Sequence, residues 1–147
     1  MPFKYCKIMC MNDINIQELI NKAFEGRANA YAPYSGFKVG AALLTSSGIY
    51  TGCNVENSSY SATNCAERTA IYKAVSEGVK DFKAIAIVGG YEGKDIEDYA
   101  APCGICRQVM SEFVDSDNFV VIMAKSPEDY VVKTLSELLP LGFKLEK

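Results

Sequence analysis

The chain of 147 residues has the size of one domain with one hydrophobic core, and its 49% hydrophobic and 22% charged residues are ordinary for a globular protein. The formal net charge of −3 argues against a nucleic-acid partner, because phosphate binding normally requires a basic face. Histidine is absent, which excludes Ser-His-Asp and Cys-His catalysis and leaves cysteine, aspartate and glutamate as possible metal ligands.

The order of predicted elements indicates an α/β domain. Residues 1–12 are expected to be an N-terminal extension and residues 13–147 a single domain. In chain order we expect a helix over 16–30, a hairpin of strands over 37–45 and 49–55, a helix over 65–77, a strand over 83–89, a helix over 104–113, strands over 119–124 and 130–133, and a last helix over 134–139. This alternation predicts a three-layer arrangement around a mixed sheet.

The six cysteines are expected to be reduced. They are Cys6, Cys10, Cys53, Cys65, Cys103 and Cys106. The chain start lacks the continuous apolar core of a secretory signal, and no stretch approaches the roughly 20 apolar residues of a membrane span. We therefore expect a cytoplasmic protein with no membrane partner, in which clustered cysteines indicate metal binding or catalysis.

Three of these cysteines form a pattern with one glutamate. Cys65-Ala66-Glu67 and Pro102-Cys103-Gly104-Ile105-Cys106 both fall at predicted helix starts. Three thiolates leave one corner of a tetrahedral zinc open, as in catalytic rather than structural sites. A three-cysteine site with P-C-x-x-C, and a glutamate that does not bind the metal, is the signature of zinc-dependent nucleobase deaminases. The pattern predicts that Cys65, Cys103 and Cys106 bind zinc and that Glu67 moves protons during catalysis.

An all-cysteine site carries a net negative charge, because three thiolates outweigh one Zn²⁺. Helix N-termini favour thiolates, and Arg68 or Arg107 could donate hydrogen bonds to the sulfur atoms. We favour Arg68, since it adjoins the Cys65–Glu67 pair.

Simpler interpretations remain open for these residues. The C-x-x-C pair alone could be a redox site, and Cys53 could close a structural four-cysteine zinc site. Glu67 and both arginines could be ordinary surface charges, and Cys53 a small packed residue.

The chain resembles the small cytidine deaminases of pyrimidine salvage. The resemblance runs from about Ile16 to Phe143 and rests on these motifs, in order: Tyr31-Ala32-Pro33-Tyr34-Ser35, Phe37-Lys38-Val39-Gly40-Ala41-Ala42, Gly52-Cys53-Asn54-Val55-Glu56-Asn57, Cys65-Ala66-Glu67-Arg68, Pro102-Cys103-Gly104-Ile105-Cys106-Arg107-Gln108 and Glu137-Leu138-Leu139-Pro140. It implies an α/β/α fold with a mixed five-stranded sheet, one zinc per chain, and hydrolytic deamination of cytidine and 2′-deoxycytidine to uridine and 2′-deoxyuridine with release of ammonia.

The resemblance also implies roles for residues that the cysteine pattern does not explain. Asn54 and Glu56 match a pair that hydrogen-bonds the ribose hydroxyls, although from the residues alone they could simply begin a loop. Phe37 matches an aromatic residue packed on the pyrimidine, although by itself it reads as a core residue, and the backbone of Ala66 matches a contact with the base. The family forms homotetramers, in which the positions of Tyr60 and Phe143 contribute to a neighbouring subunit's pocket.

Two rival functions remain at this stage. One is a deaminase of another aminopyrimidine nucleoside, of the blasticidin type. The other is a catalytically silent, zinc-stabilised interaction module. The paired Asn54 and Glu56 favour an ordinary nucleoside, and the complete ligand set with Glu67 favours an enzyme.

Overall fold

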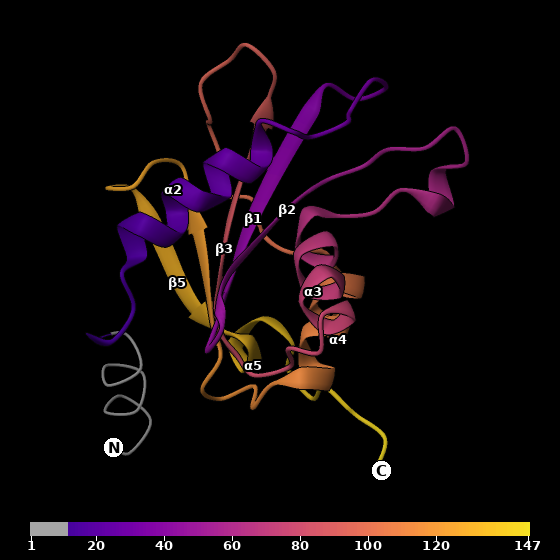
Figure 1. Cartoon of the computed structure of the whole chain (residues 1–147). Coiled ribbons are helices and arrows are strands. Elements are labelled where there is room, and N and C mark those ends of the chain that lie inside the picture. Colours follow the sequence, from indigo (N-terminus) through magenta and orange to yellow (C-terminus); the bar gives the residue numbers. More distant parts are fainter. Residues whose placement is uncertain (1–11) are drawn as a thin grey trace.

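The computed structural model describes residues 12–147, so the expected extension, with Cys6 and Cys10, lies outside the described residues except for its last position. The elements are α2 (Ile16–Arg27), β1 (Phe37–Thr45), β2 (Gly48–Cys53), the 3₁₀ helix η1 (Tyr60–Ala62), α3 (Ala66–Ser76), β3 (Phe82–Tyr91), α4 (Gly104–Phe113), β4 (Val120–Ala124), β5 (Tyr130–Thr134) and α5 (Leu135–Leu138) (Figure 1). The predicted order is confirmed, with boundaries that differ by a few residues. Each helix within residues 12–147 is too short or too polar to cross a membrane.

The five strands form one mixed sheet in the order β2-β1-β3-β4-β5. Strand β1 pairs antiparallel with both β2 and β3. Strands β3 and β4 are parallel, and α4 lies in the connection between them. Strand β5 is antiparallel to β4. The prediction of a mixed sheet within an α/β fold is therefore confirmed.

Helices cover both faces of the sheet, and the alternation of side chains along each strand explains why. In β1, Ala42 faces the core beneath α2, whereas Ala41 and Leu43 face the core beneath α3 and α4. The strand β3 is apolar on both sides because it lies in the middle of the sheet, where both faces are buried. Figure 1 shows α2 on one face and α3 with α4 on the other.

Gly52 sets how closely α3 approaches the sheet. A Cβ atom at Gly52 would lie 2.3 Å from the carbonyl oxygen of Ala66 and 2.5 Å from the backbone nitrogen of Ala70. Both contacts are with backbone atoms, so neither can be relieved by a side-chain movement. The close approach fixes the N-terminus of α3, which follows Cys65 directly.

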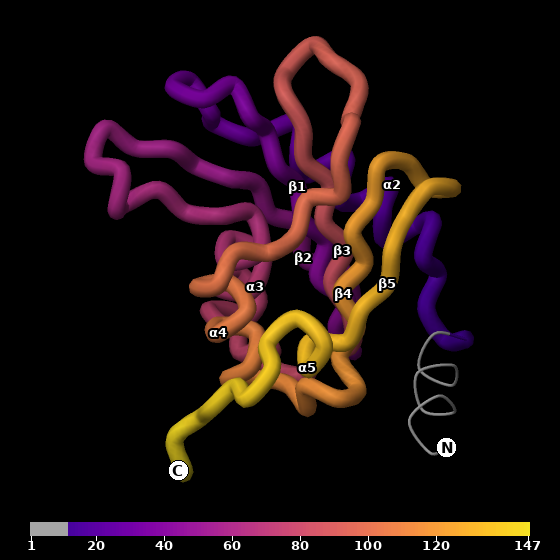
Figure 2. Tube along the Cα trace, turned by 180° about the vertical axis from the view of Figure 1, so that it is seen from behind, coloured from indigo at the N-terminus to yellow at the C-terminus, as the bar shows by residue number. Residues whose placement is uncertain are grey.

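Three segments project from one end of the sheet. They are the turn before β1, the loop after β2 that contains η1, and the loop after β3, and all three lie at the end opposite to the C-terminus (Figure 2). Pairings outside the named strands fasten two of these segments together, because Val55 bridges to both Tyr31 and Asn64.

Candidate metal centre and active site

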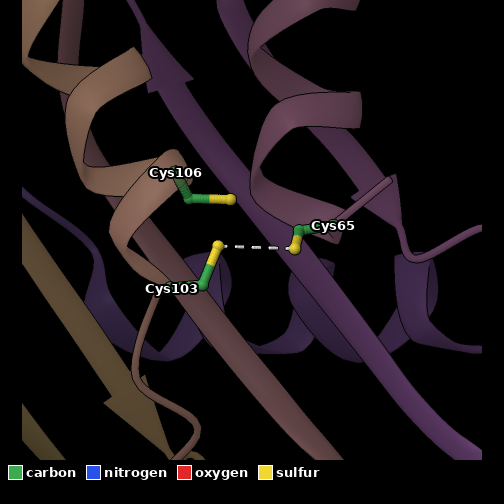
Figure 3. Close-up of side chains that lie close together, drawn as sticks. All are labelled: Cys65, Cys103 and Cys106. Carbon is green, nitrogen blue, oxygen red and sulfur yellow. Dashed lines mark hydrogen bonds between the residues drawn. The ribbon is translucent and has the colours of Figure 1, made fainter. Parts of the chain in front are cut away.

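Three cysteines from two helices meet in one cluster. Cys65 is the N-cap of α3 and Cys103 the N-cap of α4, and both have extended backbone conformations rather than helical ones. Cys106 lies in the first turn of α4 and is fully buried. Figure 3 shows the three thiol groups directed toward one another. The helix predicted from Cys65 therefore begins one residue later, at Ala66, because Cys65 caps it.

The spacing of the sulfur atoms fits a tetrahedral zinc ion. The Sγ atoms of Cys65 and Cys103 are 3.7 Å apart, and all three Sγ atoms lie within 4.8 Å of one another. Two sulfurs that are each about 2.3 Å from a tetrahedral zinc lie about 3.8 Å apart. Three thiolates supply three of four ligands and leave one position for water or substrate. The chain therefore has a site with the donor set of a catalytic zinc centre.

Cys53 is not a member of this cluster. Within residues 12–147, the only group of three or more side chains that could hold a metal ion consists of Cys65, Cys103 and Cys106. The thiol of Cys53 is half-buried, and this burial raises its pKa. A structural zinc site closed by Cys53 is therefore not supported, and Cys53 is a packed residue at the end of β2.

The two arginines near the cysteines have different partners. Arg68 donates from Nη2 to the Sγ of Cys65 at 3.3 Å. Arg107 instead donates to the carbonyl oxygens of Pro102 and Leu138, at 2.7 and 2.6 Å. Arg107 thus connects the turn before Cys103 to the end of α5. The preference for Arg68 as the hydrogen-bond donor to sulfur is supported, whereas Arg107 supports the backbone that carries the ligands.

Charge is shared unequally within the cluster. Hydrogen bonds from the Cys106 thiol and from Arg68 lower the pKa of Cys65 to about 5, although burial opposes them. The bond with Cys65 raises the pKa of Cys106, because Cys106 acts as the donor. Burial acts to lower the pKa of Arg68, but its bonds to the Cys65 and Cys106 thiols raise it overall. The site thus stabilises thiolate at Cys65 with a permanently charged guanidinium.

Glu67 is a buried acid beside the thiols. Its side chain is only 3% exposed, although glutamate is rarely buried without a partner. Burial, followed by the negative charge of Cys65, raises the pKa of Glu67 to about 7. The interpretation of Glu67 as a solvated charge on a helix face is therefore wrong.

Cys65, Cys103 and Glu67 line a cavity of about 300 Å³ that is mostly apolar. Its walls combine the start of β1, the residue after β2, one residue of β3, the loop before α3 with the N-terminus of that helix, and the segment before α4. The lining residues are Phe37, Val39, Asn54, Thr63, Asn64, Cys65, Ala66, Glu67, Ile87, Ala100, Ala101 and Cys103. A small, largely apolar cavity with a few polar groups is typical of a site for a small molecule. Phe37 and Ala66, the two residues expected near the base, both line it.

Asn54 and Glu56 lie in neighbouring cavities rather than on one surface. Asn54 lines the first cavity with Cys65 and Cys103, whereas Glu56 lines a second cavity of about 390 Å³ with Tyr34, Ser35, Tyr60 and Thr63. The two cavities share Thr63. Hydrogen bonds from the hydroxyl and backbone N–H of Ser35 lower the pKa of Glu56, so its carboxylate stays ionised at a lower pH than that of an ordinary glutamate.

Tyr60 and Phe143 are both exposed on this chain. Their exposed fractions are 78% and 68%. Tyr60 lies in the projecting loop, where its ring makes an edge contact with Tyr34, and it borders the second cavity. Phe143 lies in the C-terminal tail, where its carbonyl oxygen accepts a hydrogen bond from Gln108 of α4. Phe143 lines neither of the two cavities described above.

Several residues of the first cavity were not anticipated. Thr63 and Asn64 come from the loop before Cys65, and Ala100 and Ala101 from the segment before Pro102. The sequence did carry a signal for them, because each pair directly precedes a cysteine motif. Val39 and Ile87 line the cavity from paired strands, a contact that depends on sheet register and has no local signal.

Comparisons with known proteins agree with this geometry. The profile of the "Cytidine and deoxycytidylate deaminase zinc-binding region" matches residues 13–123. A cytidine deaminase from Sporosarcina psychrophila is 48% identical over 134 residues, which are 90% of this chain and 94% of that protein. The crystal structure of a cytidine deaminase from Burkholderia pseudomallei has 45% sequence identity and a TM-score of 0.78, and the match covers 88% of this chain and all of that one.

A blasticidin-S deaminase from Bacillus cereus is more distant. It is 36% identical over 109 residues, which are 71% of this chain and 76% of that protein.

The matched profile spans the thiols of Cys65, Cys103 and Cys106 as well as the buried Glu67. The chain therefore belongs to the zinc-binding cytidine and deoxycytidylate deaminase family.

Proposed function

We propose that this enzyme hydrolyses cytidine and 2′-deoxycytidine to uridine and 2′-deoxyuridine with release of ammonia, as part of pyrimidine salvage. The observation that carries the proposal is a cluster of three thiols beside a buried carboxyl group, with Cys65, Cys103 and Glu67 of this group lining one small apolar cavity. This combination supplies a metal site with an open position and an acid–base group beside it. The shared family supports the choice of a cytosine nucleoside.

Cys65, Cys103 and Cys106 would hold one zinc ion per chain. Zinc supplies a water activated for nucleophilic attack near neutral pH. The hydrogen bond from Arg68 to Cys65 offsets part of the charge of three thiolates and holds that sulfur in place. The helix N-termini at Cys65 and Cys103 favour the same thiolates.

Glu67 would move the protons of the reaction. Its carboxylate accepts a proton from water as the oxygen forms a bond to C4 of the base, and delivers this proton to N3. It then carries the second proton to the amino group as the C4–N bond breaks, so that ammonia leaves and the C4 carbonyl forms. A positioned acid–base group of this kind contributes about 10²–10⁴-fold in rate.

The remaining cavity residues would bind the nucleoside. Phe37 packs on the pyrimidine, and the backbone of Ala66 contacts the base. Asn54 and Glu56 bind the ribose hydroxyls from the two adjoining cavities, which meet at Thr63. The ionised Glu56 is a suitable acceptor for two hydroxyl donors.

We further propose that the protein acts in the cytoplasm as a homotetramer, with one domain over residues 13–147 preceded by an extension. The exposure of Tyr60 and Phe143 supports this assembly, because two large aromatic side chains lie uncovered in segments that project from the chain. Sedimentation of the purified protein would test it. A monomer that deaminates cytidine at full rate would contradict a pocket shared between subunits.

Turnover rates distinguish cytidine from a rival substrate of the blasticidin type. We expect cytidine to be deaminated much faster than blasticidin S, because Asn54 and Glu56 suit a sugar with free hydroxyls. The reverse preference would overturn the choice of substrate. No turnover of either compound would favour the silent, zinc-stabilised module.

The decisive experiment combines metal analysis with an ultraviolet assay for cytidine loss. We expect about one zinc per chain, activity that a strong chelator abolishes, and recovery when zinc is restored. Glu67→Gln should keep the zinc and lose activity by at least about 10²-fold. Glu77→Gln, at the exposed end of the same helix, is the matched control and should remain active. A fully active Glu67→Gln would refute the role of Glu67.

A further inference from the structure

The ladder between β1 and β2 ends before β1 does. The last pair of residues in this ladder is Gly40 with Cys53. Strand β1 nevertheless continues to Phe37, and its other edge remains paired with β3 as far as Phe37 and Tyr91. The backbone from Phe37 to Val39 therefore has one strand neighbour, and its other edge requires different partners for its polar groups.

The side chain of Asn54 supplies these partners. Its Oδ1 accepts a hydrogen bond from the backbone N–H of Val39 at 2.9 Å, and its Nδ2 donates to the carbonyl oxygen of Phe37 at 2.8 Å. The backbone N–H of Asn54 also donates to the carbonyl oxygen of Val39 at 3.2 Å. A side-chain amide has the same donor and acceptor as a peptide group, so Asn54 extends the ladder without a further strand.

These bonds act on Phe37, the residue proposed to pack on the base. The backbone N–H of Phe37 donates to Oγ of Ser35 at 3.0 Å, so both polar groups of Phe37 are held on this side. Its ring makes an edge contact with Tyr91, with ring centroids 5.1 Å apart. The ring also lies against Gly89, where a Cβ atom would be 3.1 Å from its Cε1. Phe37 is thus fixed by its backbone on one side and by packing on the other.

Glu56 continues the same set of contacts. Its Oε1 accepts from the backbone N–H groups of Tyr34 and Ser35, at 3.0 and 3.1 Å. The segment after β2 therefore holds the turn before β1 through Glu56 and the start of β1 through Asn54. Both proposed sugar-binding residues are already engaged with the chain that carries Phe37.

We propose that Asn54 is a positioning residue for Phe37, in addition to any contact with the sugar. This rests on the proposed function. Each polar atom of the Asn54 amide makes one bond to β1 and keeps capacity for another, so the two roles are compatible. The consequence is that Asn54 affects the binding of the base even when the ligand has no sugar hydroxyl for it to contact.

The test uses 2′,3′-dideoxycytidine, which lacks both hydroxyls. We expect Asn54→Ala to raise the Ki of this compound against cytidine turnover by about five- to tenfold, the effect of one or two lost hydrogen bonds. It should also speed amide hydrogen exchange at Val39 in the zinc-loaded protein. Asn57→Ala is the matched control, because the Asn57 side chain accepts a hydrogen bond from the N–H of Ser59 in its own loop, and both readouts should stay as in the wild type.

Different results would contradict the positioning role of Asn54 and the proposed function. If Asn54→Ala raises KM for cytidine but leaves the Ki of dideoxycytidine and the exchange at Val39 unchanged, Asn54 acts on the sugar alone and the inference is wrong. If Asn54→Ala reduces the zinc-loaded fraction but leaves the Ki of dideoxycytidine unchanged, Asn54 has a purely structural role and the inference is wrong. If the wild type fails to deaminate cytidine, the proposed function fails, and exchange at Val39 still decides the positioning role.

Ser35→Ala provides a second variant in case Asn54→Ala does not fold. It removes the other hydrogen bond to Phe37, and although the same hydroxyl also bonds Glu56, dideoxycytidine lacks the hydroxyls that Glu56 would bind. We expect the Ki of dideoxycytidine to rise by about two- to fivefold. An unchanged Ki would show that Phe37 does not depend on this backbone support.

Discussion

The Nη2 atom of Arg68 lies 3.3 Å from the Sγ atom of Cys65, so that a guanidinium group hydrogen-bonds directly to one of three clustered thiols. A second donor of this group, Nε, is buried and has no hydrogen-bond partner among residues 12–147. The positive charge of Arg68 is therefore held in a partly dry environment, where its effect on a thiolate is stronger than at the surface.

Substitution of Arg68 should impair the metal site. We expect Arg68→Gln to lower zinc affinity or activity by about 10–100-fold, the usual cost of removing a partner of a metal ligand. Arg68→Lys keeps the charge but not the planar group, so its zinc affinity and activity should lie between those of the wild type and Arg68→Gln. Competition with a chromogenic chelator gives the affinity, and the ultraviolet assay gives the rate. Unchanged values for Arg68→Gln would show that the helix N-termini suffice.

Gly52→Ala should disturb the metal site from a distance. The added methyl group would meet the backbone of Ala66 and Ala70, and α3 would have to move together with Cys65. We expect destabilisation of about 1–3 kcal/mol and weaker zinc binding. Thermal unfolding with and without zinc measures both effects.

Gly104→Ala is the control for Gly52→Ala in the unfolding measurement. No atom lies within 4 Å of a Cβ atom built at Gly104, and its backbone is helical. Alanine there should leave the protein as stable as before, or more stable by up to about 1 kcal/mol. Equal losses for both substitutions would contradict the argument from close approach.

Arg107→Met tests the connection between the cysteine turn and the last helix. It keeps much of the side-chain length but removes the bonds to Pro102 and Leu138, each of which involves a charged donor. Such bonds contribute about 1.5–3 kcal/mol each. We expect a lower midpoint of urea denaturation and an unchanged pKa of the Cys65 thiol, measured by its alkylation rate in the zinc-free protein. A large shift in that pKa would imply that Arg107 also acts on sulfur.

Zinc removal should destabilise the whole protein, because the ligands come from two helices that are far apart in sequence. At a free zinc concentration 100 times its Kd, binding contributes about 2.7 kcal/mol, or about 5–10 °C in Tm for a chain of this size. Differential scanning fluorimetry with a chelator, and then with zinc restored, measures this shift. A Tm that responds to thiol reductants but not to zinc would favour the redox interpretation of the C-x-x-C pair.

The sequence predicted the three thiols and favoured Arg68 as their hydrogen-bond donor, but it did not reveal the partners of Arg107. Arg68 follows Cys65 by three residues on one helix, so local geometry alone brings them together. The direction of Arg107 depends on Leu138 at the end of α5, a contact between residues 31 apart that no local pattern reveals. Contacts within one helix follow from residue spacing, and the metal ligands follow from their motif, whereas the contact of Arg107 with Leu138 depends on the packing of distant elements.

The same distinction applies to Asn54 and Glu56, the pair proposed to bind the sugar. Alternation along a strand predicts that Asn54 and Glu56 face the same way. The strand β2 ends at Cys53, however, and Val55 pairs with residues of two other segments. The two side chains therefore line adjoining cavities, and their bonds to the β1 edge and the preceding turn depend on tertiary structure.

The cysteines at the two helix N-caps carry a cost in folding free energy. An N-cap position normally holds a serine, threonine, aspartate or asparagine whose side chain bonds the first free N–H groups, and its loss costs about 1 kcal/mol. Neither Cys65 nor Cys103 makes such a bond. The protein thus leaves two helices without side-chain caps so that their first residues can face a metal, and serine at either position would favour a helix that is easier to fold but unable to complete the site. Cysteine at these two positions therefore permits metal binding but lowers the local stability of α3 and α4.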